Sequence, residues 1–218
     1  MTRVHVVGSS RAAELVREGL GKLGHELVAT ESAEAVFACT DRIADVRALV
    51  NAIGRDCVLA NCGPLATVEV QEAAAAAGAP VVSHPLQPGV LAEFLDPPLV
   101  IIGADEQWAA RRIGAVYRQL SCHVLYTDIA SADLVGPACH GFRLLNRCYF
   151  TQLTEVCQAA GVDMTSLLKG LQFDERIRIP GDNDPVDSHS VERLLAASAD
   201  SSSPVLRLLD GIVRARKR

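Results

Sequence analysis

Short apolar runs alternate with helical segments in this chain of 218 residues, up to residue 128. The runs are Val4–Val7, Leu27–Thr30, Ala35–Cys39, Val58–Asn61, Pro80–Ser83, Leu99–Gly103 and His123–Tyr126. Continuous apolar strands separated by helices predict a parallel sheet that is covered on both faces and built by right-handed crossovers. We therefore expect residues 1–128 to form an α/β domain.

The connection between the second run and the third is abnormally short. Only Glu31 to Glu34 separate these two runs, whereas a parallel crossover needs about a dozen residues or more. We expect an abridged sheet in which this connection is altered.

Residues 129–218 show helical patterns only, which predicts a second, all-helical domain. Apolar residues recur at spacings of three and four on one face of a long helix, namely Phe142, Leu145, Tyr149, Leu153, Val156 and Ala160. Gly161 ends this helix, and Asp163 begins another that runs through Leu171. After an irregular stretch, a last helical pair spans Val191–Ala197 and Pro204–Arg214.

Charge and cysteine usage exclude several classes of protein. A formal net charge of −5 argues against a nucleic-acid partner, because such proteins present a basic face to the phosphates. The 7 cysteines form no Cys-x-x-Cys pair, which argues against a disulfide framework and fits a reducing compartment. No apolar run reaches the roughly 18 residues that span a bilayer, and the N-terminus has no signal-peptide pattern. We expect a cytoplasmic protein without a nucleic-acid or membrane partner.

The opening segment has the pattern of a dinucleotide-binding strand, turn and helix. The turn Gly8–Ala13 lies between an apolar strand and a helix over Glu14–Leu23. Such a turn directs backbone N–H groups and the positive end of the helix dipole toward a pyrophosphate. The Rossmann fingerprint has glycine at the first, third and sixth turn positions, and here Ser10 and Ala13 occupy the last two.

Glu31 follows the second apolar run, where a carboxylate can accept hydrogen bonds from the adenine ribose and disfavours a 2′-phosphate. This residue favours NAD as the cofactor. The residues expected to bind it are Gly8, Ser9, Ser10, Arg11, Glu31 and Thr40. Ser10 places a side chain where bare backbone is preferred, so a βαβ unit without a ligand is an open alternative.

Several motifs follow the opening turn in a familiar register. Gly24-His25-Glu26 and Glu31 come after the first helix, and Val82-Ser83-His84-Pro85 and Pro97–Gly103 come further along. In this order they resemble the nucleotide-sugar dehydrogenases, which oxidise UDP-glucose or GDP-mannose to the uronic acid. The resemblance covers nearly the whole chain and stops where the family's third domain begins. It implies a truncated, divergent relative.

The resemblance also implies that residues 129–218 are the family's central dimerisation domain. We expect a homodimer that is formed through the helix at 132–160. The family's activity implies a small-molecule substrate and two hydride transfers to NAD, with a cysteine thiolate that holds the intermediate.

Most positions of the family's catalytic groups hold other residues in this chain. Leu86 replaces the glutamate after Asn-Pro, and Gly136 and His140 replace a lysine and an asparagine on the central helix. The family's cysteine aligns with Val186, and Cys62 replaces the threonine of its Ser-Thr-x-Pro turn. The family reaction is therefore not expected here.

Cys62, His84 and His140 are the candidate catalytic residues of the expected cleft. His140 has the chemistry of an acid or base for one-step oxidation of a hydroxyl or reduction of a carbonyl. Cys62 is a nucleophile only if a histidine lowers its pKa, and such a cysteine more often serves in packing. Together with His189 these residues have the ligand types of a zinc site, but no motif spacing supports one, and we expect no metal.

Three hypotheses for function follow from these residues. The first is an NAD-binding oxidoreductase of the nucleotide-sugar dehydrogenase superfamily with altered chemistry on a hydroxyl or carbonyl substrate. The second is a catalytically inactive relative that acts as a binding or scaffolding partner. The third is a non-redox enzyme that uses Cys62 and the cleft histidines, because a fold does not fix its chemistry.

Overall fold

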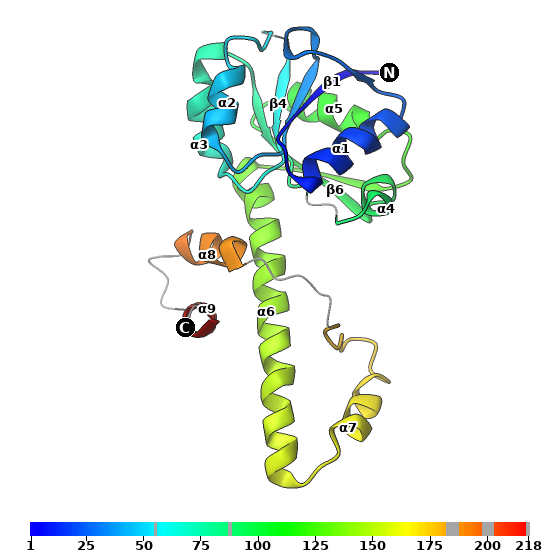
Figure 1. The fold of residues 1–218 in the computed structure, drawn as a ribbon, viewed down its shortest axis with the longest axis vertical. Helices are drawn as coiled ribbons and strands as arrows, with labels where there is room; N and C mark the ends of the chain where they lie inside the picture. Colours follow the sequence, from blue (N-terminus) through cyan, green and yellow to red (C-terminus); the bar gives the residue numbers. More distant parts are fainter. Residues whose placement is uncertain (55, 87–88, 182–187, 198–202, 217–218) are drawn as a thin grey trace. The chain divides into compact units, whose positions relative to one another are not determined.

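The computed structural model describes the chain except for residues 55, 87–88, 182–187, 198–202 and 217–218 (Figure 1). It consists of two compact units, Met1–Asp133 and Leu134–Arg218. The division lies a few residues after the predicted boundary at 128, within the first turns of a long helix.

The first unit contains a seven-stranded sheet in the order β2-β1-β3-β4-β5-β6-β7. The strands are β1 (Arg3–Val7), β2 (Glu26–Leu27), β3 (Ala35–Ala38), β4 (Val58–Asn61), β5 (Val81–Ser83), β6 (Leu99–Gly103) and β7 (His123–Thr127). Neighbouring strands are parallel except β5 and β6, which are antiparallel. The predicted α/β fold is confirmed, with a mostly parallel sheet.

Helices cover both faces of this sheet, which explains why its central strands β3 and β4 are largely apolar and buried along their whole length. On one face lie α1 (Arg11–Lys22), α4 (Leu91–Leu95) and α5 (Gln107–Val116); on the other lie α2 (Ile43–Leu49) and α3 (Thr67–Ala74), which is followed by the short turn η2 (Ala75–Ala77) (Figure 1). Leu59 and Ala60 are consecutive, point to opposite faces and are both fully buried. Burial of such a leucine side chain contributes roughly 1.5–3 kcal/mol.

The short connection passes around the start of β1. β2 and β3 pair with opposite sides of this strand, so that Val4 lies between Leu27 and Ala35. The link contains the single turn η1 (Thr30–Ser32) and returns to the beginning of β1, where the Glu34 N–H donates to the Arg3 carbonyl at 2.8 Å. The chain reverses direction here, and the abridged connection is confirmed.

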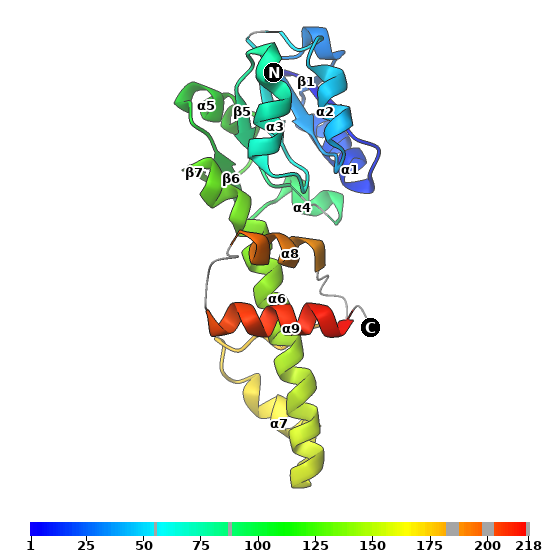
Figure 2. The ribbon, with the colours of Figure 1, turned by 90° about the vertical axis from the view of Figure 1, so that its left-hand side faces the viewer.

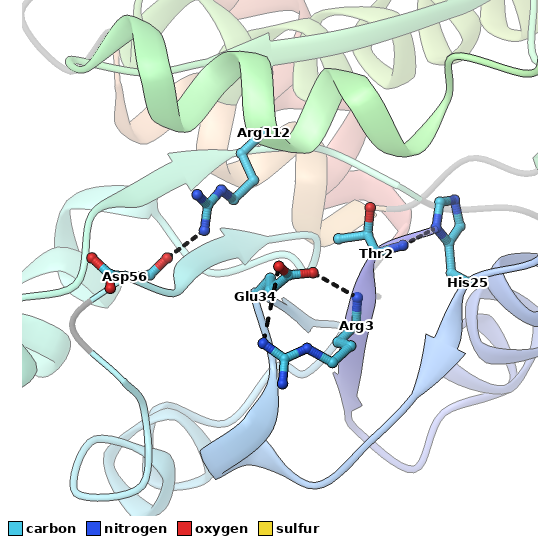
Figure 3. A network of polar contacts seen from close by, with 6 residues as sticks. All are labelled: Thr2, Arg3, His25, Glu34, Asp56 and Arg112. Atoms are coloured by element: carbon cyan, nitrogen blue, oxygen red, sulfur yellow. Dashed lines mark hydrogen bonds and ion pairs between the residues drawn. The ribbon is translucent and has the colours of Figure 1, made fainter.

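The predicted second strand over Leu27–Thr30 is wrong in its extent. β2 ends at Leu27, because the chain must turn back within a few residues to reach the far side of β1. Figure 3 shows the closure: the Glu34 carboxylate accepts from the Arg3 N–H at 2.9 Å, and His25 Nδ1 lies 3.2 Å from the Thr2 N–H. These contacts hold the reversal at the amino-terminal edge of the sheet.

The second unit is helical, as predicted. Its helices are the greater part of α6 (Ile129–Ala160), α7 (Met164–Leu171), α8 (Ser188–Ala196) and α9 (Pro204–Arg216). Gly161 ends α6 at a φ of 66°, and the Asp163 carboxylate caps α7 by accepting from the N–H groups of Thr165 and Ser166.

Beside α6, α8 and α9 contribute Val191 and Leu209 to a small core around Leu144 (Figure 2). Val186, the residue aligned with the family's cysteine, lies outside the described residues. In the described part of the chain, no helix has both the length and the apolar character to cross a bilayer.

Candidate functional site

A cavity of about 560 Å³ opens at the carboxyl ends of the central strands of the first unit. Its walls come from the turn after β1, the segment Cys39–Arg42 after β3, and the segment Cys62–Pro64 after β4. β2 and β3 lie on opposite sides of β1, so this is the point at which the strand order reverses. Open α/β sheets bind their ligands at such a point.

Two glycines let the walls of the cavity approach each other closely. Gly8 has a φ of 123°, and a Cβ atom on it would lie 2.1 Å from the carbonyl oxygen of Cys39. A Cβ on Gly63 would lie 2.1 Å from the carbonyl oxygen of Thr40. Both segments therefore pack backbone against backbone, and only glycine fits at either position.

α1 begins at Arg11, three residues before the predicted start at Glu14, and Ser10 is its N-cap. The Ser10 hydroxyl accepts from the Ala13 N–H at 3.2 Å, so the side chain is directed onto the helix end. Serine at this position is thus explained by its role as the N-cap of α1, which the glycine fingerprint does not include. The positive end of this 12-residue helix faces the cavity wall that Ser9, Ser10 and Ala12 form.

Hydrogen bonds fix the segment after β3. The Thr40 hydroxyl donates to Asp45 at 2.6 Å and accepts from the Arg42 N–H at 3.1 Å. The Arg42 Nε lies 3.9 Å from the other carboxylate oxygen of Asp45. With Asp41, these side chains give the rim two carboxylates and one guanidinium. The rim can accept hydrogen bonds from ligand hydroxyls and can attract one anionic group.

The predicted cofactor residues divide between the cavity and other places. Ser9, Ser10 and Thr40 line it, and Gly8 packs directly behind its wall. Arg11 is exposed and pairs with Glu14 at 3.2 Å.

Glu31 is not among the residues that line the cavity. It lies in η1, on the segment that returns toward Arg3 and the amino end of β1. The expectation that Glu31 stands at the carboxyl end of a strand is therefore wrong, because β2 ends before it.

Cys62 lines the cavity but is only 1% exposed. Its thiol donates to the Ala60 carbonyl at 3.5 Å. Burial, and then the neighbouring Cys39, raise the pKa of Cys62 well above 9. A protonated, enclosed thiol is a poor nucleophile, so these contacts favour a packing role for Cys62.

His84 directly follows β5 and is fully buried against the rings of Phe37 and Tyr117. Its Nδ1 donates to the Ile101 carbonyl at 2.8 Å, which leaves Nε2 to accept from the Tyr117 hydroxyl at 2.7 Å. Burial lowers the pKa of His84 from 6.5 to about 4, against a smaller effect of the Ile101 carbonyl. Both ring nitrogens are engaged, and these contacts favour a structural role over proton transfer.

His140 belongs to the second unit, where it is buried on α6 and interacts with another group. Its predicted role as an acid or base stays a prediction. Among the residues whose side chains are described, no group of three or more His, Cys, Asp or Glu is placed to hold a metal ion. The side chain of His189 lies outside that set.

A buried polar cluster around Asp133 was missed at the sequence level. Asp133 accepts from the Thr67 hydroxyl at 2.6 Å, the Ser83 hydroxyl at 2.5 Å and the Thr67 N–H at 2.8 Å. Asn61 donates to the Thr67 hydroxyl at 2.9 Å. The cluster ties together the carboxyl ends of β4 and β5, next to the Cys62–Pro64 wall. The only sequence signals were Asn61 and Ser83, the polar residues that end two of the apolar runs.

Curated relatives match part of the chain, and no family model matches it. UDP-glucose 6-dehydrogenase of Rickettsia bellii is 25% identical over 88 residues, which are 39% of this chain and 20% of that protein. GDP-mannose 6-dehydrogenase of Azotobacter vinelandii is 22% identical over 83 residues, 38% of this chain and 19% of that protein. The matched stretch spans about a fifth of each relative.

Solved structures match nearly the whole chain in fold. UDP-glucose dehydrogenase of Pyrobaculum islandicum matches with a TM-score of 0.78 at 18% identity. The match covers 99% of this chain and 68% of that protein's chain. UDP-D-ManNAc dehydrogenase of Pyrococcus horikoshii gives 0.80 at 13% identity, with 97% and 68% covered. For 3-hydroxyisobutyrate dehydrogenase of Mycobacterium tuberculosis the values are 0.79 and 12%, with 99% and 93% covered. The resemblance to nucleotide-sugar dehydrogenases is confirmed, in sequence weakly and in fold throughout.

Proposed function

We propose that this chain, which resembles the nucleotide-sugar dehydrogenases in sequence and fold, is an NAD-linked oxidoreductase acting on a small hydroxyl or carbonyl compound. The cavity at the carboxyl ends of β1, β3 and β4 carries the proposal. It lies where the strand order reverses, and the start of α1 and two close-packed glycine turns form its surroundings. This is the place and the chemistry that a pyrophosphate and the adjoining ribose require.

The residues of the cavity fit one part of NAD well. Backbone at Ser9–Ala12 and the helix dipole would hold the phosphates, and Arg42 at the rim would add one positive charge. Asp41 and Asp45 would accept from ribose hydroxyls. A bound nicotinamide supplies the hydride donor or acceptor. The buried Cys39 and Cys62 on the wall would help to exclude water from that ring.

A single hydride transfer is the chemistry that the remaining residues support. Leu86, on the cavity wall, has no titratable group where the family places a glutamate. The protonated Cys62 does not favour a covalent intermediate. The proton that an alcohol loses, or that a carbonyl gains, needs an acid or base, and His140 stays the sequence-based prediction for that role.

Binding of NADH to the purified chain tests the proposal, followed by cofactor fluorescence. We expect saturable binding below millimolar concentration. Ser9→Asp puts a carboxylate beside the phosphate position and should weaken binding about tenfold or more. Since acidic residues are favourable near a helix start, this variant should still fold.

Ser32→Asp is the matched control, because Ser32 is also exposed but lies in η1, outside the cavity. It should bind NADH as the wild type does. No binding to the wild type at millimolar NADH, or equal binding by wild type and Ser9→Asp, contradicts the proposal.

An inactive binding partner is the second candidate, because α6 exposes large apolar side chains. Phe142, Tyr149 and Val156 are 68%, 60% and 61% exposed and lie seven residues apart, on one side of the helix. We propose that a second copy of the chain covers this stripe, so that a homodimer forms in either case. Monomeric proteins rarely expose a contiguous apolar stripe of this kind to solvent, so the stripe supports pairing of two chains.

Phe142→Glu should convert the dimer to a monomer in sedimentation equilibrium. Gln158→Glu adds a carboxylate on the opposite side of the same helix and should leave the dimer intact. A wild-type monomer at tens of micromolar concentration would rule out the pairing.

All seven cysteines are free, which supports the cytoplasm as the proposed compartment.

A further inference from the structure

We propose that the cavity recognises only the nicotinamide-mononucleotide half of the cofactor, and that the adenosine half contributes almost nothing to binding. This inference rests on the proposed function and specifies the ligand class of the same cavity. It follows from the side of β1 that faces away from the cavity.

Dinucleotide-binding sheets are built from two mononucleotide-binding halves, one on each side of the first strand. In this chain β3 to β7 lie on one side of β1, and the two-residue β2 alone lies on the other. The last paired residue of β2 is Leu27, opposite Val4, three residues before the end of β1 at Val7. At about 3.3 Å per residue, β2 stops roughly 10 Å short of the carboxyl edge.

The place of the missing strand is taken by a side chain of α1. The N–H groups of Glu26 and Val28 donate to the carbonyls of Thr2 and Val4, so a longer β2 would next pair with the carbonyl of Val6. Arg17 donates to that carbonyl at 3.2 Å and to the carbonyl of Gly8 at 2.9 Å.

The Arg17 guanidinium therefore satisfies the backbone that a second strand would have paired. It also fills the space beside the carboxyl end of β1. An adenosine on this side of β1 would meet the Arg17 side chain, and β2 would not extend far enough to contact it.

The chain after β2 moves away from the carboxyl edge. The Val28 carbonyl lies 2.8 Å from His5 Nδ1. Glu34 contacts Arg3, at the amino-terminal end of β1 (Figure 3). None of the residues 24–38, all of which the structure describes, lines the cavity. The carboxylate that distinguishes NAD in such folds, expected at Glu31, is therefore absent from the ligand side.

The cavity itself has the groups and the room for one nucleotide. Its volume of about 560 Å³ lies within the range of roughly 300–1,000 Å³ for small-molecule sites. A helix start for the phosphate, carboxylates for ribose hydroxyls and a half-apolar wall for the ring all occur on the β3 side.

Competition between nucleotides tests the inference directly. We would titrate the wild-type chain with NADH and with reduced nicotinamide mononucleotide, and follow the fluorescence of the reduced ring. The expected dissociation constants agree within about threefold. AMP should displace neither ligand at millimolar concentration, and NADPH should bind as NADH does.

NADH that binds about tenfold or more tightly than the mononucleotide, or NADPH that binds more tightly than NADH, would overturn the inference and leave the proposed function standing. Failure of both NADH and the mononucleotide to bind would overturn the proposed function and the inference with it. Glu31→Ala supplies a second readout: its affinity for NADH should equal that of the wild type. Ser9→Asp should weaken both ligands by the same factor.

Discussion

The two sides of β1 differ in how far their strands extend toward the ligand edge. On one side β3 and β4 run on into the cavity wall, and Gly8 and Gly63 let these segments touch through their backbones. On the other side β2 is two residues long, and Arg17 bonds the carbonyls near the end of β1. A sequence fingerprint can thus persist while one half of its structural setting is lost.

The largest expected effect is at the glycine on the cavity side. Gly8→Ala places a Cβ against the Cys39 carbonyl at a φ of 123°, and should lower the free energy of unfolding by about 3 kcal/mol or more. Gly24→Ala, just before β2, adds a Cβ at a φ of 75° with nothing within 4 Å, and should cost about 1 kcal/mol. Urea unfolding measures both; equal losses would remove the distinction between the two sides.

A pH effect of similar size is expected from His84, which follows β5 on the cavity side of β1. Its pKa is lowered to about 4 in the folded chain from 6.5, so between these values the unfolded chain binds the extra proton. Stability therefore falls as pH falls from 6.5 to 4, by about 3 kcal/mol from this residue.

Comparing wild type with His84→Gln at pH 7 and pH 5 isolates this contribution. The variant should be less stable at pH 7 and should lose less stability on acidification. The same loss in both proteins would show that His84 is not held neutral by burial.

The smallest effect is expected on the β2 side. Arg17→Met leaves the carbonyls of Val6 and Gly8 without the guanidinium and should cost about 1–2 kcal/mol in urea unfolding. Arg11→Met removes only an exposed pair with Glu14 and should change stability by less than about 1 kcal/mol. Equal stability of the two arginine variants would contradict the role of Arg17 in satisfying the β1 carbonyls that a longer β2 would have paired.

Local patterns predicted the strands that lie between two helical layers. β4 and β6 have the predicted bounds, because every residue of a strand between two helical layers must be largely apolar. Gly161 and Asp163 marked the end of α6 and the start of α7 for equally local reasons.

Contacts between distant residues were beyond those patterns. Leu27–Thr30 resembles a strand, and only the need to return to β3 ends it at Leu27. The bond of His84 to Tyr117 spans 33 positions, and that of Asp133 to Ser83 spans 50, so neither residue showed its partner in the sequence. Arg17 had no reason to be singled out until β2 proved to be short.

The most direct test of the account is a crystal structure of the chain grown with NADH. We predict an ordered pyrophosphate and nicotinamide ribose between the Gly8–Ser10 turn and the Thr40–Asp45 segment, with no contact from the adenine to residues 26–34. An adenine seated against Glu31, or a cofactor bound away from the cavity, would contradict it.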